Sequence, residues 1–546
     1  MAKKIVRSDE RKPVMGLDVN GPVFFTSSIF IIISIALTLI FKKEAESAFD
    51  SIQTFVANSA GWFFVLCVNI FLIFVVYLAF SKFGELRLGG KDAKPEFKTL
   101  SWFAMLFSAG MGIGLLFWSI AEPVTHFMNP PLTEGGTAMA AKEAMDFTFL
   151  HWGFHAWGIY TLVGLSLAYF TYSHGLPLTI RSVFYPILGD KIYGIGGDII
   201  DIFAVLATLF GLATSLGLGV QQIAAGLEHV FGVSSGITTQ ILLIAGITGI
   251  ATASVVLGVD KGVKFLSEWN MRVAILLLVL VVLLGPTIFI FQSFVQNTGS
   301  YLYSFLEIST WTESYTGNNW QNAWTVFYWG WWIAWSPFVG MFIARISKGR
   351  TIREFILGVL IVPSLITFFW ISAFGSTSIQ QALTGDQNII QAIDDNVATA
   401  LFVFLEDYPF AVILNVIGVI LIAGFFVTSS DSGSLVVDSL TSGGKIDAPV
   451  GQRIFWAVTE GAVAAVLLVG GGLQALQTAS IVTGLPFALI LLFMCYSLYT
   501  GLRDEYLKLE ERKAQKELES YEGVISEIIK KRSEKNIKDS SKNSES

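Results

Sequence analysis

The sequence has few of the residues on which most enzyme and metal sites depend. Its 546 residues include two cysteines, Cys67 and Cys495, which lie far apart in apolar runs and predict neither a disulfide framework nor a zinc site. Among the five histidines, His151 and His155 have the i,i+4 spacing that can place two imidazoles on one helix face. No H-E-x-x-H pattern accompanies them, so a metal site at this pair is only a weak alternative.

Charged residues are also scarce. Asp, Glu, Lys and Arg make up 14% of the chain and hydrophobic residues 53%, whereas a soluble domain carries about 25% charged residues. The net charge of -7 argues against a nucleic-acid partner. Much of the chain is therefore expected to face lipid or other protein segments rather than water.

Long apolar runs take the place of the missing charge. The first of them is too long for the core of a signal peptide. A membrane-spanning helix needs about 20 mostly apolar residues. About a dozen segments meet that test, namely 22–41, 61–81, 101–120, 147–170, 199–228, 237–257, 270–294, 323–344, 354–374, 408–429, 452–472 and 478–500. The sequence therefore predicts an all-α polytopic membrane protein with about 12 transmembrane helices.

Basic residues gather in every second connection between these segments. They are Lys82, Arg87, Lys91, Lys94, Lys98, Arg181, Lys191, Lys261, Lys264, Arg345, Lys348, Arg350, Arg353, Lys445 and Arg453. The connections 295–320 and 375–407 contain no Lys or Arg. The positive-inside rule then predicts a multi-pass protein of the cell membrane with both termini in the cytoplasm.

Acidic residues are scarce within the predicted spans. Glu122 follows the third span, and Asp201 and Asp431 lie at segment ends, where capping or ion pairing is the expected role. An intramembrane active site or proton relay needs ionisable groups deep inside the spans. The chain is therefore predicted to be a transporter or channel rather than an enzyme, with a site made of backbone, hydroxyl groups and aromatic rings.

Two stretches depart from regular membrane helices. SAGMGIGLLFW at 108–118 has a glycine at every second position from 110 to 114. It indicates either close helix packing or an unwound segment whose backbone lines a cavity. FFVTSSDSG at 425–433 gathers four hydroxyl groups, which either bond back to their own helix or offer oxygen ligands to a cation such as sodium.

Two further segments concentrate aromatic residues. They are HWGFHAWGIY at 151–160 and WTVFYWGWWIAWSPF at 324–338, and the second holds five of the chain's 15 tryptophans. Interfacial anchoring explains Trp324 but not the mid-span rings, which are Trp152, Trp157, Tyr160, Trp331, Trp332 and Trp335. Helical spacing lets each set share a broad face. Two such faces can enclose a quaternary ammonium, which ring faces attract by about 2 kcal/mol or more per desolvated contact. Ser336-Pro337 is a possible break in the second helix.

Together these segments resemble the betaine/carnitine/choline transporters, in particular their sodium-coupled glycine betaine symporters. The resemblance covers residues 15–500. It is carried by GMGIG at 110–114, HWGFHAW at 151–157, ATLFG and SLGLG within 207–219, FYWGWWIAWSPFVGMFIARISKGRTIREF at 327–355 and FFVTSSDSGS at 425–434. It implies a transporter domain over 21–502 that has two extra helices followed by two inverted five-helix repeats, spans three to seven and eight to twelve.

The resemblance also implies binding residues. The six mid-span rings would surround the trimethylammonium of the substrate, and its carboxylate would face the backbone of Gly110, Met111, Gly112 and Gly114. One sodium ion would bind carbonyl and hydroxyl groups of Ser108, Met111, Phe425, Thr428 and Ser429. A second sodium ion would use Thr208 and Phe338. Because Leu212 replaces the hydroxyl expected one turn after Thr208, the number of coupled sodium ions stays open.

The third glycine of the motif bears on the substrate. Choline carriers and carnitine exchangers of this family tend to have Asp there, whereas Gly114 leaves a neutral site that suits a zwitterion. The predicted function is sodium-coupled import of glycine betaine for osmoprotection by alternating access, with sodium as the coupling ion and no other cofactor. The alternatives are a sodium-independent exchanger or proton-coupled importer of carnitine- or choline-like solutes, and an osmosensor that binds betaine without pumping it. The resemblance also implies a homotrimer.

The two ends of the chain are polar. Residues 1–20 form a short cytoplasmic segment, and 503–546 form a charged tail. The first half of this tail suits a helix with i,i+4 Glu–Lys pairs, and its polar last part predicts disorder. The tail either serves solubility alone or regulates the protein, for example by contacting anionic membrane lipid through KKR at 530–532.

Overall fold

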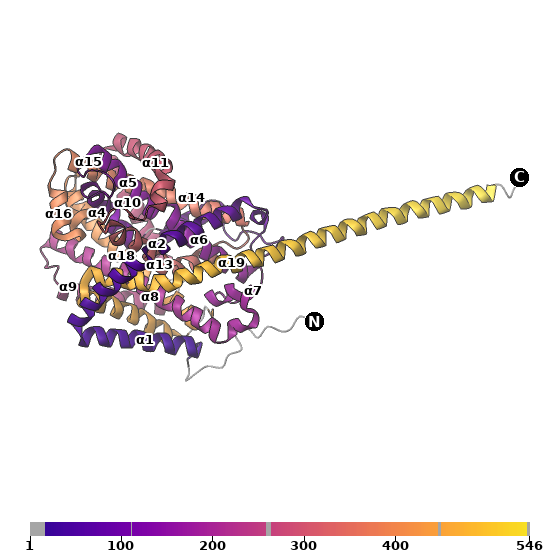
Figure 1. Ribbon diagram of the computed structural model, residues 1–546, viewed down its shortest axis with the longest axis horizontal. Helices are drawn as coiled ribbons and strands as arrows, with labels where there is room; N and C mark the ends of the chain where they lie inside the picture. The colour runs from indigo at the N-terminus through magenta and orange to yellow at the C-terminus, as the bar shows by residue number, and fades with distance from the viewer. Residues whose placement is uncertain (1–16, 111, 258–263, 446–448, 543–546) are drawn as a thin grey trace.

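Helices make up almost the whole protein. The computed structural model describes residues 17–110, 112–257, 264–445 and 449–542, and nearly all of them belong to helices that pack into one bundle (Figure 1). These ranges contain no β-strand, and an isolated β-bridge joins Arg87 and Thr351. The prediction of an all-α polytopic membrane protein is confirmed.

The helices follow one another along the chain with short connections. Their bounds are α1 (Gly21–Ile40), α2 (Lys42–Phe80), α3 (Thr99–Gly110), α4 (Ile113–Met128), α5 (Ala138–Trp152), α6 (Phe154–Tyr172), α7 (Tyr185–Leu188), α8 (Ile195–Phe231), α9 (Ile237–Leu257), α10 (Lys264–Leu284), α11 (Thr287–Thr310), α12 (Trp320–Ala323), α13 (Thr325–Ile346), α14 (Ile352–Ile371), α15 (Thr377–Leu383), α16 (Asn388–Asn396), α17 (Ala400–Glu406), α18 (Ala411–Thr441) and α19 (Val450–Lys542).

Nine helices of the described ranges are long and apolar enough to cross a membrane, or ten if the bent pair α3–α4 forms one span. One of the nine, Asn388–Glu406, lies in the predicted connection 375–407 and was not expected to span. Besides the bent pair, two features lower the number of predicted spans that are counted. The range α19 comprises two helices that meet at a kink at Gly471 and Gly472, where the sequence predicted the boundary between spans 452–472 and 478–500, but it counts as one. The aromatic helices α6 and α13 are not among the nine, although almost all of their residues are buried. The inverted-repeat arrangement stays a prediction.

Several predicted segments differ from the helices in detail. The span expected at 270–294 is present with different bounds, Phe265–Leu284, because α10 ends at Leu284 and α11 begins at Thr287 after Gly285 and Pro286. The hydroxyl-rich stretch 425–433 lies inside α18, not at its end. Conversely, α13 continues through Pro337, so the possible break there is absent.

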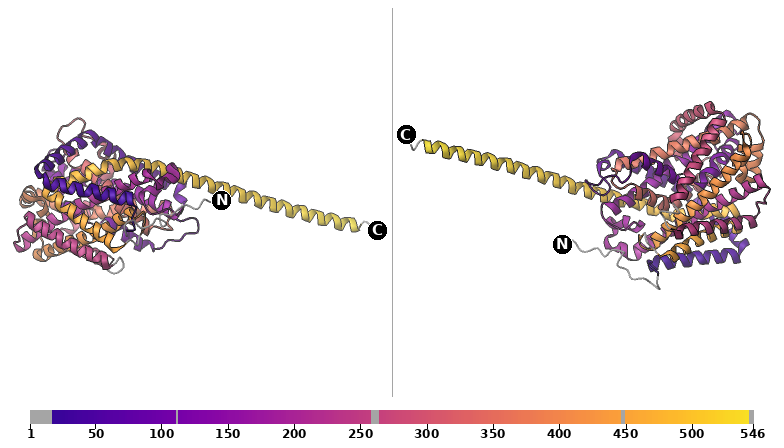
Figure 2. Two further views of the ribbon diagram at one scale, coloured as in Figure 1. Left: turned by 90° about the horizontal axis from the view of Figure 1, so that it is seen from below. Right: turned by 180° about the vertical axis from the view of Figure 1, so that it is seen from behind.

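The charged tail extends the last helix far outside the bundle. The helix α19 continues to Lys542, and its exposed C-terminal part projects from the bundle in all three views (Figures 1 and 2). The prediction of disorder for the polar end is therefore wrong for the described residues of the tail. Its first half is helical as predicted and contains an ion pair between Glu510 and Lys513 at i,i+3, while the i,i+4 pair of Glu527 and Lys531 lies in the second half.

The aromatic helix α13 lies in the centre of the bundle. It packs against α6, α8 and α19, and glycines let these neighbours approach closely. A Cβ atom at Gly340 would lie 2.5 Å from Cγ1 of Val163 in α6, and one at Gly330 would lie 2.9 Å from Cα of Ile481 in α19. Small residues at such crossings are the usual means of bringing membrane helices together. They hold the tryptophans of α13 deep in the protein.

Candidate functional site

The glycine-rich stretch coincides with a sharp bend between two helices. The axes of Thr99–Ser108 and Ile113–Met128 differ by 66°. Gly110 is the last residue of α3, and Gly112 is the N-cap of α4 with an extended backbone. Met111, which was predicted to contact both substrate and sodium, lies outside the described residues. The first N–H groups of α4 have no partner within their helix, and such a terminus attracts anions.

Two tryptophans of α13 flank this helix terminus. A Cβ atom at Gly114 would lie 2.5 Å from Cη2 of Trp331 and 3.3 Å from Cη2 of Trp152. At Gly112 the nearest atom would be Cη2 of Trp335, at 3.9 Å. The glycine at 114 therefore makes room for rings, whereas the position at 112 is spacious.

Five of the six predicted rings form one continuous cluster. The centroids of Trp152 and Trp332 are 5.0 Å apart with nearly perpendicular planes, and Trp331 and Trp332 stack at 4.7 Å. Tyr160 links Trp332 to Trp157, at 6.2 Å and 5.6 Å. We call Trp152, Trp157, Tyr160, Trp331 and Trp332 the aromatic box.

Trp335 lies apart from the aromatic box. Its ring contacts Phe338, with centroids 5.3 Å apart, and lines a separate cavity one turn further along α13. The sequence prediction grouped it with the five other rings because helical spacing alone places all three tryptophans of α13 near one face. Packing against α8 separates it, since a Cβ atom at Gly211 would lie 2.9 Å from its ring.

The box depends on a helix break that the sequence pattern did not predict. The expected span 147–170 consists of α5 and α6, which meet at Gly153. Trp152 therefore ends one helix, while Trp157 and Tyr160 belong to the next. The same break separates His151 in α5 from His155 in α6, so these imidazoles do not lie on one continuous helix.

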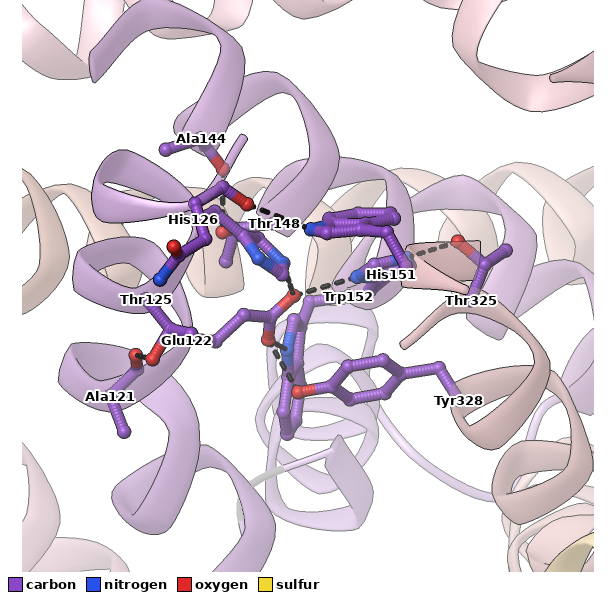
Figure 3. A network of polar contacts seen from close by, with 12 residues as sticks. Ala121, Glu122, Thr125, His126, Ala144, Thr148, His151, Trp152, Thr325 and Tyr328 are labelled. Atoms are coloured by element: carbon purple, nitrogen blue, oxygen red, sulfur yellow. Dashed lines mark hydrogen bonds and ion pairs between the residues drawn. The ribbon is translucent and has the colours of Figure 1, made fainter. Parts of the chain in front are cut away.

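A buried carboxylate lies behind the aromatic box. Glu122 is a fully buried residue within α4, not a residue beyond the span as predicted. Its Oε2 accepts hydrogen bonds from Trp152 Nε1 at 2.7 Å and from the hydroxyl of Tyr328. Its Oε1 lies 2.7 Å from His151 Nδ1 and 3.2 Å from His126 Nε2 (Figure 3). Sequence reasoning missed this network; the i,i+4 pair of Glu122 and His126 was its one available signal.

The network also reaches a second tryptophan. The indole of Trp332 donates to the carbonyl of His151 at 2.8 Å, and Thr325 lies 3.0 Å from His151 Nε2. Ligand atoms of Glu122, His126 and His151 lie within 4.8 Å of one another, a spacing that a metal ion can bridge. In this structure Oε1 of Glu122 is hydrogen bonded to both imidazoles.

Most residues of the first predicted sodium site line one cavity. It has a volume of about 90 Å³, and its walls include Ser108, Trp335, Phe338, Phe425, Thr428 and Ser429. The Thr428 hydroxyl lies 3.1 Å from Gly424 O and 3.3 Å from Phe425 O, so both interpretations of the hydroxyl cluster, bonding back and lining a cavity, apply to it.

Asn270 is a polar wall of this cavity that sequence reasoning did not single out. It lies in α10 and is almost completely buried, and neither atom of its amide has a hydrogen-bond partner among the described residues. Its amide packs on α18, where a Cβ atom at Gly424 would lie 2.1 Å from Oδ1. An unpaired buried amide offers an oxygen to a cation or a water molecule.

The residues of the second predicted sodium site have a less polar environment. The Thr208 hydroxyl donates to Ala204 O in its own helix at 2.7 Å. Leu212 is fully buried in contact with α18, where a Cβ atom at Gly433 would meet it at 2.4 Å. Phe338 lines the cavity of the first site instead.

Buried carboxylates are more common than the sequence analysis assumed. Asp431 in α18 accepts a hydrogen bond from Ser254 at 2.9 Å, and Glu460 in α19 lies 3.3 Å from the Ser430 hydroxyl. Both are fully buried. The expected capping role of Asp431 is wrong because α18 continues for ten residues beyond it, to Thr441. Asp201, by contrast, pairs with Arg181 as expected.

Comparison with known proteins agrees with these features. The sequence model of the betaine/carnitine/choline family transporters matches residues 22–507. A glycine betaine transporter of Vibrio parahaemolyticus is 50% identical over 90% of this chain and 95% of its own length. A glycine betaine/proline/choline/ectoine transporter of the same organism is 47% identical (90% and 88%), and a glycine betaine transporter of Acinetobacter baylyi is 44% identical (90% and 75%). The protein is thus a membrane transporter and not an enzyme, and it belongs to the betaine/carnitine/choline transporter family.

Proposed function

We propose that the protein imports glycine betaine together with sodium ions. The observation that carries this proposal is the position of the α4 N-terminus, beside Trp331 and Trp152 of the box and next to Trp335 of the hydroxyl-lined cavity. A zwitterion fits this arrangement, because ring faces attract its trimethylammonium while free N–H groups attract its carboxylate. Relatives named as glycine betaine transporters support the same substrate.

Sodium is proposed to bind in the cavity lined by Ser108, Phe425, Thr428 and Ser429. Hydroxyl and carbonyl oxygens are ligands that a hard cation prefers, and the amide of Asn270 adds a further oxygen in reach of the same cavity. We propose this one site, with Met111 as an additional ligand. The back-bonded Thr208 and the apolar Leu212 do not favour a second ion beside Phe338.

The wider organisation remains that of the sequence predictions. We propose an orientation with both termini in the cytoplasm, supported by the alternating basic connections, and alternating access by two inverted repeats. A homotrimer, an osmoprotective role and contacts of the tail with anionic lipid are further parts of the proposal. The exposed position of Lys530, Lys531 and Arg532 on the projecting helix is consistent with such a contact.

The test is uptake of labelled glycine betaine into proteoliposomes that contain the purified protein. We expect accumulation above the external concentration when sodium is higher outside, and little uptake when potassium replaces it. Equal uptake in the two conditions contradicts symport and favours the exchanger. Uptake driven by a proton gradient alone favours the proton-coupled alternative, for which the buried Asp431 and Glu460 provide ionisable groups. Binding without accumulation favours an osmosensor.

A further inference from the structure

We propose that Glu122 positions the aromatic box and supplies a fixed negative charge that favours a quaternary ammonium inside it. The inference rests on the proposed function, because it assumes that the box receives this cation. It concerns substrate recognition by a residue that lies outside the box and belongs to a different helix from every ring.

The carboxylate joins three helices through both of its oxygens. It holds the indole of Trp152 from α5 and the phenol of Tyr328 from α13, and it reaches His126 one turn away in α4. The Trp332 indole donates to the backbone carbonyl of His151, so the main chain of α5 fixes this ring directly beside Trp152. Trp152 of the box and its neighbour Tyr328 are therefore oriented by one side chain (Figure 3).

The partners of Glu122 fit an ionised carboxylate. An indole N–H can only donate, and an ionised carboxylate can only accept. His151 can donate from Nδ1 while its Nε2 accepts from Thr325, and His126 can donate from Nε2. With this assignment all four neighbours donate to the two oxygens.

The two histidines leave that charge uncompensated when they are neutral. The buried Nδ1 of His126 has no hydrogen-bond partner among the described residues, although an imidazolium needs an acceptor at each nitrogen. None of the residues that hydrogen bond to the carboxylate is lysine or arginine. A negative charge in a site with little water acts over a longer range than it does in water.

The charge of Glu122 takes the place of a counter-charge inside the aromatic box, where the rings leave no space for an acidic side chain. An acidic side chain at position 114 would place a counter-charge directly in the box, but the Trp331 ring lies against Gly114 and leaves no space for one. Glu122 acts instead from behind Trp152, whose Nε1 it holds while the ring faces Trp332. The negative charge thereby increases the attraction of the ring faces for a cation.

The decisive variant is Glu122→Gln, which keeps the shape and removes the charge. Its amide oxygen can accept from Trp152 and Tyr328, and its NH₂ group can donate to the histidine lone pairs after a change of tautomer. Glu143→Gln is the matched control, because Glu143 is a buried carboxylate of α5 that accepts from the backbone N–H of Leu132 instead of from a ring.

The readout compares a cation with an uncharged molecule of the same shape. Choline and dimethylbutanol, in which carbon replaces the ammonium nitrogen, compete with labelled glycine betaine for binding to the purified transporter. We expect the preference for choline over dimethylbutanol to fall at least tenfold in Glu122→Gln and to stay within twofold in Glu143→Gln. Glu122→Asp, which keeps the charge on a shorter chain, should weaken both competitors alike and leave the preference intact.

Each outcome decides between charge and structure. An unchanged preference in Glu122→Gln overturns the proposal, as does an equal loss in Glu122→Asp or a wild-type protein that does not distinguish the two competitors. A variant that binds but no longer transports still reports the preference. If the wild-type protein binds no glycine betaine at all, the proposed function fails instead.

Discussion

Two neighbouring parts of α13 build sites of opposite character. Trp331 and Trp332 contribute to the aromatic box, in which the rings contact one another and hydrogen bonds fix the indoles of Trp152 and Trp332. One turn further, Trp335 and Phe338 line a cavity of about 90 Å³ with hydroxyl groups and an unpaired amide. The first is closely packed and the second leaves space for an ion and its ligands.

The difference reflects the two ions that are proposed to bind. A quaternary ammonium has no N–H group to donate, so it is recognised by ring faces whose geometry must be held by packing. Sodium needs several oxygen ligands within direct reach, which backbone carbonyls and short hydroxyl side chains supply. Rigid rings for one ion and a polar cavity for the other therefore share one helix.

The largest expected effect comes from opening the aromatic box. Trp332→Ala removes a ring that touches Trp152, Trp331 and Tyr160. Loss of about 2 kcal/mol of cation–π attraction corresponds to a rise of about 30-fold in KM for glycine betaine. Uptake kinetics in proteoliposomes measure it.

The matched control for that variant is Trp456→Ala. Trp456 is also fully buried, but it lies in α19 against Phe24 and Phe455. Its loss should reduce the amount of folded protein without changing KM by more than about twofold, since no ring of the box contacts it. Equal changes in KM for both variants would show that the box assignment is wrong.

A smaller effect is expected from crowding the box. Gly114→Ala places a Cβ atom 2.5 Å from the Trp331 ring, and the ring must move to relieve the clash, at a cost of about 1–3 kcal/mol. We expect KM for glycine betaine to rise about tenfold, which corresponds to about 1.4 kcal/mol. Gly112→Ala is the control, because its Cβ atom would make an ordinary contact with Trp335 at 3.9 Å. A larger effect at position 112 would contradict this view of the bend.

Substitutions in the hydroxyl-lined cavity should change the sodium dependence of uptake. Thr428→Ala removes one proposed oxygen ligand and should raise the sodium concentration for half-maximal uptake about fivefold, because a lost hydrogen bond or ligand to a charged group costs about 1 kcal/mol or more. KM for glycine betaine at saturating sodium should change little. Thr459→Ala, which removes a back-bonded hydroxyl in α19, serves as control. Unchanged sodium dependence in Thr428→Ala would exclude this hydroxyl from the site.

The smallest effect is expected at the second predicted sodium site. Thr208→Val removes a hydroxyl that already bonds to Ala204 O and faces no polar partner at Leu212. The sodium dependence of uptake should stay within about twofold of the wild type, as is usual for a change without a new unsatisfied group. A strong loss of sodium activation in Thr208→Val would show that Thr208 belongs to a second sodium site.

Much of the fold could be predicted from the sequence, because membrane helices are recognised by their long apolar runs. The exceptions share one cause, which is local chemistry inside an apolar stretch. Gly153 divides one predicted span, and Gly285 and Pro286 divide another. Hydropathy averages over such positions, whereas the backbone bends at individual residues.

The candidate site was predicted in part. Residue types alone indicated rings for a cation and hydroxyls for an ion, and the structure brings five rings together and four predicted sodium ligands to one cavity. Glu122 and Asn270 were not predicted, because their role depends on partners from α5, α13 and α18 that lie far away in sequence.

The sequence by itself determined the membrane-spanning all-α class, the aromatic and hydroxyl-rich segments and, through its motifs, the transporter family. The tertiary structure decided which rings contact each other, that Trp335 lies outside the aromatic box, and that the Glu122 carboxylate bonds to Trp152. The physical reason is that composition and periodicity describe one helix at a time. A binding site arises where several helices meet, and at Gly114 the distance to the rings of Trp331 and Trp152 depends on all of them.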